Sequence, residues 1–137
     1  MKMQESPEDY LEAIYMLSLK QQHVRSIDVA RHLGYSKPSV SVAMKRLREN
    51  SYVIMDDNGY LTLTEAGSVI AKRVYERHEI ITQYLVQIGV DPETAQKDAC
   101  RMEHVVSEET FQKIKEMCDK SSVKQNIAPI NHRGVRL

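Results

Sequence analysis

Three side chains that could bind a metal occur within five residues of one another: Cys100, Glu103 and His104. In a helix, the spacing i, i+3 and i+4 places all three on one face. A thiolate, a carboxylate and an imidazole together suit a borderline divalent ion such as Mn²⁺, Fe²⁺, Co²⁺, Ni²⁺ or Zn²⁺. These residues therefore raise the hypothesis of a divalent-metal site on a helix.

Further candidate ligands lie on two earlier segments. Asp9 and Glu12 are three residues apart in a predicted helix and share a face, and His78 lies in a predicted long helix. The spacing alone leaves a second interpretation open. The Cys-x-x-Glu-His run could be coincidental, and the two acids could serve only the dipole of the helix that they begin. No Cys-x-x-Cys or His-Glu-x-x-His motif strengthens the metal interpretation.

The N-terminal half has the signals of a helix-turn-helix. Serines stand at predicted N-caps, and Gly34 follows the second helix, where a C-terminal glycine is expected. Two helices joined by a short glycine-containing turn form the unit whose second helix enters the DNA major groove. The predicted helices are 7–20, from Ser26 to Leu33, and from Ser36 to Glu49, with Ser6, Ser26 and Ser36 as N-caps.

A β-hairpin is predicted directly after the third helix. Two strand-like runs, Tyr52–Met55 and Tyr60–Thr64, flank Asp56-Asp57-Asn58-Gly59. Asn-Gly between such runs is the strongest short hairpin signal. A hairpin in this position is a wing, so the fold class is mainly α: a winged helix-turn-helix over residues 1–72, followed by a helical domain.

Three helices are predicted in the C-terminal half. The first begins at the N-cap Thr64 and ends near Gly89, the second follows the N-cap Asp91 and runs to about Val105, and the third follows Ser107 and runs to about Lys120. We expect a helical domain over 73–120 and a loosely ordered tail over 121–137, which has no periodicity. The predicted apolar stripes are Val69, Ile70, Val74, Ile81, Tyr84, Leu85 and Ile88 on the long helix, and Phe111, Ile114 and Met117 on the last.

The third helix presents small and basic side chains on its outer face. Lys45, Arg46 and Arg48 could neutralise phosphates, while small residues near the helix N-terminus would let the backbone approach base edges. Dimerisation would compensate for weak readout by one helix, although a solvated charged face remains the alternative. Lys2 could add a backbone contact. The candidate DNA-binding residues are Arg25, Ser36, Lys37, Pro38, Ser39, Ser41, Val42, Lys45 and Arg46.

The composition sets broad limits. Of the 137 residues, 42% are hydrophobic, which is ordinary for a globular protein, and the formal net charge of zero neither favours nor excludes a nucleic-acid partner. Two cysteines are too few for a disulfide framework, and Cys118 is expected to be a small core residue. No segment resembles a signal peptide or membrane span, so we expect a cytoplasmic protein with no membrane partner.

Three segments resemble the diphtheria-toxin-repressor family of metal-dependent regulators. Residues 98–107, which contain Cys100, Glu103 and His104, resemble the family's metal-site helix, and residues 6–17 and 77–80 resemble its manganese-transport-regulator branch. The resemblance implies a winged helix-turn-helix joined to a metal-binding and dimerisation domain. It also implies a homodimer that binds palindromic operator DNA when Mn²⁺ or Fe²⁺ is bound at the domain junction, and that represses metal-uptake genes without an organic cofactor. The implied ligands are Asp9, Glu12, His78, Cys100, Glu103 and His104.

The implied ligand set mixes two branches of the family. Cys100 is typical of the iron branch, whereas Asp9 is typical of the manganese branch. Thr82 and Gln96 stand where the iron branch has ligands of an ancillary site, and the chain is expected to have no SH3-like third domain. A thiolate favours Fe²⁺, Co²⁺ or Zn²⁺, while the carboxylates suit Mn²⁺. Two ions bridged by Glu103 remain compatible with six ligands.

Two other function classes are compatible with parts of the pattern. A winged-helix regulator of the multidrug-resistance type would sense a small organic ligand in an apolar pocket, with no metal. An enzyme would use Cys100 and His104 as nucleophile and base, but it would also need an oxyanion site, and no glycine-rich turn lies near these residues. We expect a regulator and not an enzyme.

Overall fold

The computed structural model describes residues 6–125 of the chain. It forms two compact units, Met1–Arg73 and Val74–Leu137. Lys2 and residues 126–137, which were part of the sequence predictions, lie outside the described residues. No helix among residues 6–125 combines the length and apolar character needed to cross a membrane.

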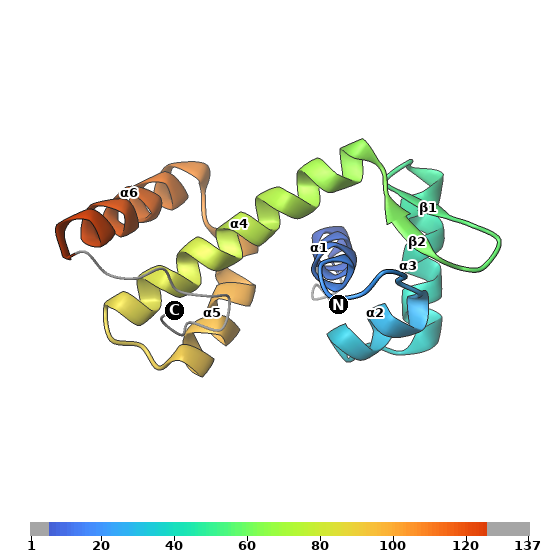
Figure 1. Ribbon diagram of the computed structural model, residues 1–137, viewed down its shortest axis with the longest axis horizontal. Helices are drawn as coiled ribbons and strands as arrows, with labels where there is room; N and C mark the ends of the chain where they lie inside the picture. Colours follow the sequence, from blue (N-terminus) through green and yellow to red (C-terminus); the bar gives the residue numbers. More distant parts are fainter. Residues whose placement is uncertain (1–5, 126–137) are drawn as a thin grey trace. The chain divides into compact units, whose positions relative to one another are not determined.

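The first unit begins with three helices, α1 (Pro7–Ser18), α2 (Ser26–Leu33) and α3 (Lys37–Glu49) (Figure 1). The Ser6 Oγ accepts hydrogen bonds from the amides of Glu8 and Asp9, and the Ser36 Oγ accepts from Ser39. These two serines are the predicted N-caps. Gly34, at φ 73°, ends α2 in the left-handed conformation that favours glycine.

Two helix boundaries differ from the prediction. α1 ends at Ser18, two residues earlier than expected. The N-cap of α2 is Arg25 rather than Ser26, because the carboxylate of Asp28 turns back to accept a hydrogen bond from the Arg25 amide at 2.9 Å. An acid in the first turn therefore satisfies the amide that begins this helix, and Ser26 is its first helical residue.

The wing consists of β1 (Val53–Met55) and β2 (Leu61–Leu63), which pair antiparallel with Val53 opposite Leu63. The hairpin was predicted, and its loop shows why Gly59 is required there: this residue has a φ of 81°. Asp56 closes the loop through its Oδ1, which accepts from the amides of Asn58 and Tyr60. Strand β2 makes a further backbone hydrogen bond on its other edge, because the Leu61 amide donates to the Val24 carbonyl oxygen at 2.7 Å.

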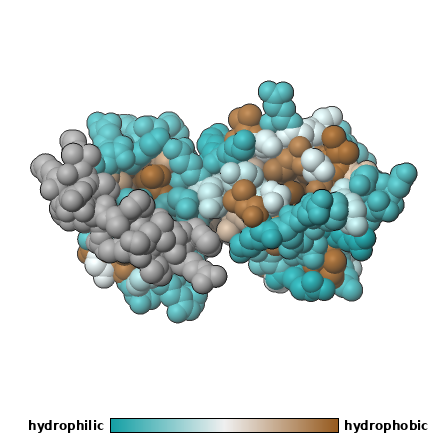
Figure 2. Space-filling view, in the orientation of Figure 1, coloured by the Kyte–Doolittle hydropathy of each residue, from teal (hydrophilic) through white to brown (hydrophobic). Residues whose placement is uncertain are grey.

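One apolar core holds the helices and wing of the first unit together. It includes Val40, Met44 and Leu47 of α3, and every helix of this unit and both strands contribute to it. In the view of Figure 2, apolar residues also reach the surface of this unit in patches among polar ones. The buried core residues are Tyr10, Leu11, Ala13, Ile14, Leu17, Val24, Val29, Ala30, Val40, Met44, Leu47, Val53, Leu61 and Ala71.

The second unit contains most of α4 (Glu65–Gln87), together with α5 (Pro92–Val105) and α6 (Glu108–Gln125). The Asp91 carboxylate accepts from the Thr94 amide at 3.2 Å and begins α5 as predicted. The predicted tail was wrong over 121–125, where α6 continues. No glycine or proline occurs between Lys120 and Pro129, so nothing in the covalent structure ends the helix at the predicted point.

The apolar stripes of the long helices are only partly buried. Ile81 and Phe111 are buried and pack with Ala99 as the small core of the second unit. Val69 and Ile88 on α4 are exposed by 63% and 60%, although the sequence placed both on its apolar face. The second unit also buries three polar side chains, those of His78, Thr82 and Glu103.

Candidate metal centre and DNA-binding surface

Helices α4 and α5 bring three of the predicted ligands together. One ligand atom each of His78, Cys100 and Glu103 lies within 4.8 Å of the other two. The His78 Nδ1 is 3.1 Å from the Glu103 Oε1 and 3.8 Å from the Cys100 Sγ. The helical spacing of Cys100 and Glu103 makes this possible, because both point toward the same turn of α4.

The cluster is buried on one side and open on the other. His78 and Glu103 are 5% and 2% exposed, whereas Cys100 is an exposed residue. Burying an ionised carboxylate is costly unless a hydrogen-bond or charge partner compensates, and the imidazole of His78 is such a partner for Glu103. The exposed thiol marks the side from which a solute could reach the three donors.

The donor set fits a divalent ion. Nitrogen, oxygen and sulfur ligands bind such ions at roughly 2.0–2.3 Å, so two donors of one ion lie roughly 3–4 Å apart. The distances of His78 Nδ1 to the Glu103 oxygen and to the Cys100 sulfur, 3.1 Å and 3.8 Å, are of this size. The three side chains could therefore hold an ion with little rearrangement.

His104 lies on the other side of the Glu103 carboxylate. Its Nε2 is 4.0 Å from the Glu103 Oε2, while the Oε1 of the same carboxylate faces His78. The two oxygens of Glu103 thus face two different imidazoles. This is the arrangement that a carboxylate needs if it is to bridge two ions.

The remaining predicted ligands, Asp9 and Glu12, lie on α1 in the first unit and are half-buried. Asp9 also has a local role, because its amide donates to the Ser6 cap. Their part in binding a metal stays a prediction.

The two positions where the iron branch has ancillary ligands carry no carboxylate or imidazole. Thr82 is fully buried in the second unit, and its hydroxyl has no hydrogen-bond partner among the described residues.

Cys118 is buried as predicted, with its thiol 3.7 Å from the Ile80 carbonyl. Burial raises the pKa of the Cys118 thiol to about 11, with a smaller contribution from Asp119. This thiol is therefore protonated at neutral pH and is a poor ligand and nucleophile.

Arg77 is part of the site's surroundings, although the sequence gave no reason to select it. Its Nη1 donates to the carbonyl oxygens of Glu103 and Val106, at 3.2 and 2.7 Å. Its Nη2 donates to the Glu108 carboxylate at 2.9 Å, and its guanidinium lies over the Phe111 ring. One side chain of α4 thereby contacts the end of α5 and the start of α6.

The predicted DNA-binding residues of α3 lie on its exposed side. Lys37, Pro38, Ser41, Val42, Lys45 and Arg46 are exposed, and Ser39 is half-buried. Ser36 is exposed as well, but its hydroxyl accepts from the Ser39 amide as the N-cap. The apolar residue Val42, 53% exposed, is available for a contact with a thymine methyl group.

Arg25 belongs to an aromatic stack at the loop end of the wing, where Tyr60 precedes β2. Its guanidinium lies 4.8 Å from the centre of the Tyr60 ring, and the His23 ring stacks on the same ring at 4.0 Å. His23 and Arg25 flank the buried Val24, and both contact the Tyr60 ring. The sequence analysis selected Arg25 but missed His23 and Tyr60, whose contact joins segments far apart in the chain.

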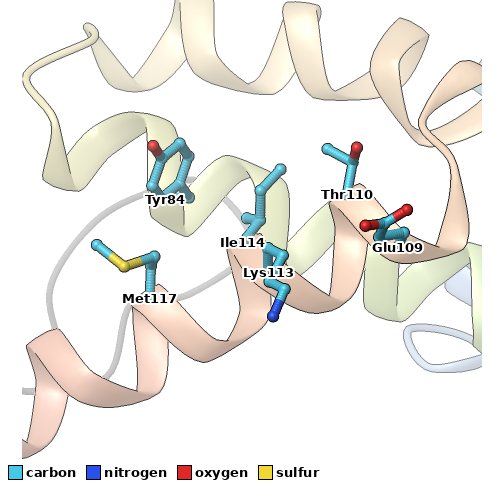
Figure 3. A pocket seen from close by; sticks show the side chains of 6 residues that line it. All are labelled: Tyr84, Glu109, Thr110, Lys113, Ile114 and Met117. Atoms are coloured by element: carbon cyan, nitrogen blue, oxygen red, sulfur yellow. The ribbon is translucent and has the colours of Figure 1, made fainter.

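A pocket in the second unit is separate from the candidate ligands. It has a volume of about 390 Å³ and is lined by Tyr84 of α4 and by residues of α6 (Figure 3). Met117, at one end, is 51% exposed, although the sequence placed it on the apolar stripe of α6. The other lining residues are Glu109, Thr110, Lys113 and Ile114.

Comparison with known proteins covers the whole described chain. Residues 2–63 match the family model of the iron-dependent repressor N-terminal DNA-binding domain. Residues 64–132 match the model of the iron-dependent repressor metal-binding and dimerisation domain.

Manganese regulators are among the similar proteins. The transcriptional regulator MntR of Salmonella typhimurium is 38% identical over 104 residues, which are 76% of this chain and 66% of that protein. MntR of Escherichia coli O157:H7 is 37% identical over 117 residues, 85% of this chain and 76% of the relative. The solved structure of the manganese regulator SloR superimposes with a TM-score of 0.75 at 25% identity, covering 96% of this chain.

The chain is shorter than these proteins: it spans 66% of the Salmonella relative and 62% of the SloR chain. The two halves of the fold, the candidate ligands and the two family models nevertheless indicate the same family. The chain belongs to the diphtheria-toxin-repressor family of metal-dependent regulators, of which the MntR proteins are one branch.

Proposed function

We propose that this protein is a metal-dependent transcriptional repressor of metal-uptake genes that binds operator DNA as a homodimer. The observation that carries the proposal is the cluster of His78, Cys100 and Glu103, whose donor atoms lie within 4.8 Å of one another. The exposed small and basic face of α3 supports the DNA-binding part. The names of the similar manganese regulators support the metal-sensing part.

The proposed ligand set contains six residues from both halves of the chain. His78, Cys100, Glu103 and His104 belong to the second unit, and Asp9 and Glu12 belong to α1. A bound divalent ion would supply the positive charge that offsets the repulsion among the acidic ligands. Because α1 is part of the DNA-binding unit, ligands contributed by both units would link metal binding to the state that binds DNA.

The proposed DNA contacts come from α3 and from the start of α2. Lys37, Lys45 and Arg46 neutralise phosphates, and Ser41 and Val42 reach base edges. A single helix with such small side chains discriminates weakly between sequences, so the proposal includes a palindromic operator read by two copies of the chain.

Cys100 bears on which metal the proposed site prefers. A thiolate favours Fe²⁺, Co²⁺ or Zn²⁺ over Mn²⁺, relative to the Glu that the manganese branch has at this position. The carboxylates of Asp9, Glu12 and Glu103 keep the set suitable for Mn²⁺. We propose that the protein responds to both Mn²⁺ and Fe²⁺, with a second ion held through the other oxygen of Glu103.

The test is DNA binding titrated with each metal. DNA fragments that the full chain selects from a random pool would be titrated with Mn²⁺, Fe²⁺ and Zn²⁺, and again after chelation. We expect tight binding with Mn²⁺ or Fe²⁺ and weak binding with chelator. Metal-dependent binding by the Glu103→Ala, His104→Ala variant would contradict the proposed site.

A second variant tests the mixed ligand set. Cys100→Glu is expected to shift the preference toward Mn²⁺, because it replaces a soft ligand with a hard one. Unchanged metal preference in this variant would contradict the role given to the thiolate.

A further inference from the structure

We propose that Arg77 is a positioning residue for the metal centre, which it holds in shape by capping the C-terminal turn of α5. The inference rests on the proposed function, because it concerns the same site. Arg77 itself lies outside the ligand cluster, and its side chain is 14% exposed.

The last turn of α5 is a weak place for metal ligands. Helix α5 ends at Val105, so Glu103 and His104 lie in its final turn. Carbonyl groups at a helix C-terminus have no amide partner within the helix, and helix ends fray. Two of the three candidate ligands on α5 therefore need an outside contact to keep their backbone fixed.

Arg77 supplies that contact. Its Nη1 donates to the carbonyl oxygen of Glu103 itself, at 3.2 Å, and to that of Val106, at 2.7 Å. A cation that donates to the last carbonyls also interacts favourably with the negative end of the helix dipole. The residue that carries the buried carboxylate is thus held at its backbone by Arg77 and at its side chain by His78.

The guanidinium is itself held in place by α6. Its Nη2 donates to the Glu108 carboxylate at 2.9 Å, and its central carbon lies 5.1 Å from the centre of the Phe111 ring. Phe111 is 3% exposed and belongs to the core of the second unit. Because Arg77 directly precedes His78 in α4, one turn of α4 fixes both the imidazole and the turn of α5 that faces it.

A neighbouring ion pair provides a matched control. Glu76 of α4 and Lys115 of α6 are 2.7 Å apart, so this pair also joins α4 to α6. Glu76 is exposed and Lys115 half-buried, and no contact joins the pair to α5 among the described residues. Loss of this pair changes the packing of α4 on α6 without touching the end of α5.

The experiment measures Mn²⁺ affinity of the full chain directly, from the electron paramagnetic resonance signal of free Mn²⁺, for the wild type and for Arg77→Lys, Arg77→Met and Lys115→Met. Outer contacts of metal ligands typically change affinity about 10–100-fold. We expect a loss of about tenfold or more in Arg77→Met and a smaller loss in Arg77→Lys, which keeps the charge but not the paired donors. Lys115→Met should stay within about twofold of the wild type.

The Co²⁺ spectrum supplies the readout that a loss of stability alone would not change. In Arg77→Lys, at a temperature where the variant remains folded by circular dichroism, the thiolate-to-cobalt band should shift or weaken. An unchanged affinity and spectrum in folded Arg77→Lys would overturn the inference, as would an equal loss in Lys115→Met. If Arg77→Met does not fold, Arg77→Lys decides alone. A wild-type chain that binds neither ion would instead contradict the proposed function.

Discussion

Each of the two units of this protein has its own internal contacts, and these contacts differ in kind between the units. The first unit buries one continuous apolar core to which α1, α2, α3, the start of α4 and both strands contribute. The second unit has a small apolar cluster of Ile81, Ala99 and Phe111, and beside it buries His78 and Glu103. Polar contacts add to this cluster, with Arg77 joining α4, α5 and α6.

The difference bears on how each unit responds to solutes. Apolar burial stabilises in proportion to area and depends little on ligands. A buried carboxylate and imidazole stabilise only when their partners are satisfied, and a bound ion changes that balance. The first unit is therefore stabilised mainly by its apolar core, while the stability of the second unit is expected to change when a metal binds.

The largest expected effect is in the apolar core of the first unit. Leu11→Ala removes a fully buried side chain, and such substitutions cost about 3–5 kcal/mol of unfolding free energy, through lost burial and the cavity left behind. Urea unfolding followed by circular dichroism measures the loss. Leu19→Ala, at a position 60% exposed, is the control and should stay within about 0.5 kcal/mol of the wild type. Equal losses in both variants would contradict the core described for α1.

The fold of the first unit could be predicted because its signals are local. Ser6, Ser36 and Gly34 act within a few residues of their own positions, and the structure confirms them. The errors were of the same local kind. Asp28 accepts a hydrogen bond from the Arg25 amide, so that Arg25 and not Ser26 is the N-cap of α2. Helix α6 continues past Lys120 because nothing in the chain ends it there.

The site was predictable only in part. Cys100, Glu103 and His104 share a helical face by spacing, but their approach to His78 depends on packing between helices, which spacing does not give. Arg77 was missed because its contacts with α5 are to backbone carbonyl groups, which every residue carries. Tyr60 and His23 were missed because their contact is between segments 37 residues apart in number. A sequence identifies donor side chains more readily than the groups that hold them in place.

The two cysteines sharpen the comparison within the second unit. Cys100 is exposed at the candidate centre, whereas Cys118 is buried with its pKa raised to about 11. At pH 8 iodoacetamide should modify Cys100 faster than Cys118, because Cys100 is exposed, whereas burial and the raised pKa of Cys118 leave little of its thiolate to react. Mass spectrometry of digests measures both rates, and excess Co²⁺ should protect Cys100 alone.

The raised pKa of Cys118 also gives a pH dependence. The folded state holds the thiol proton more tightly than the unfolded chain does, so the stabilisation is present below the ordinary pKa of 9.0 and is lost as the pH rises toward about 11. Modification of Cys118 should accelerate over that interval. Rapid modification of Cys118 at pH 8 in the folded protein would contradict its burial.

Metal-linked stability is the next largest effect. With free metal at about 30 times its dissociation constant, a ligand that binds only the folded state adds about 2 kcal/mol. Thermal unfolding with Mn²⁺ and with chelator should show this gain in the wild type and not in Glu103→Ala. The control is Glu109→Ala, an exposed acid on α6 that lines the pocket and not the candidate centre. If Glu103→Ala retained the gain, the stability of the second unit would not depend on a metal bound through Glu103.

The smallest effect is expected where the first unit uses polar contacts, because these lie on its surface. Tyr60→Ala removes the ring over which the Arg25 guanidinium lies at 4.8 Å. Exposed cation–π contacts stabilise by about 0.5–1 kcal/mol, so affinity for the selected DNA should fall about threefold. Tyr60→Phe keeps the ring and should retain most of the affinity, unless the hydroxyl, 3.4 Å from Arg25, contributes more than the ring.

Salt dependence separates the two roles that Arg25 and Tyr60 have in this contact. Arg25→Ala removes a cation, so the slope of log affinity against log salt should fall by about 1 if the guanidinium neutralises a phosphate. Tyr60→Ala leaves the charge in place and only frees its orientation, so the slope should stay unchanged while the affinity falls at every salt concentration. If both variants change the slope equally, the ring does more than orient the arginine. If neither does, the stack only stabilises the loop end of the wing, and the DNA contacts of the first unit come from α3 alone.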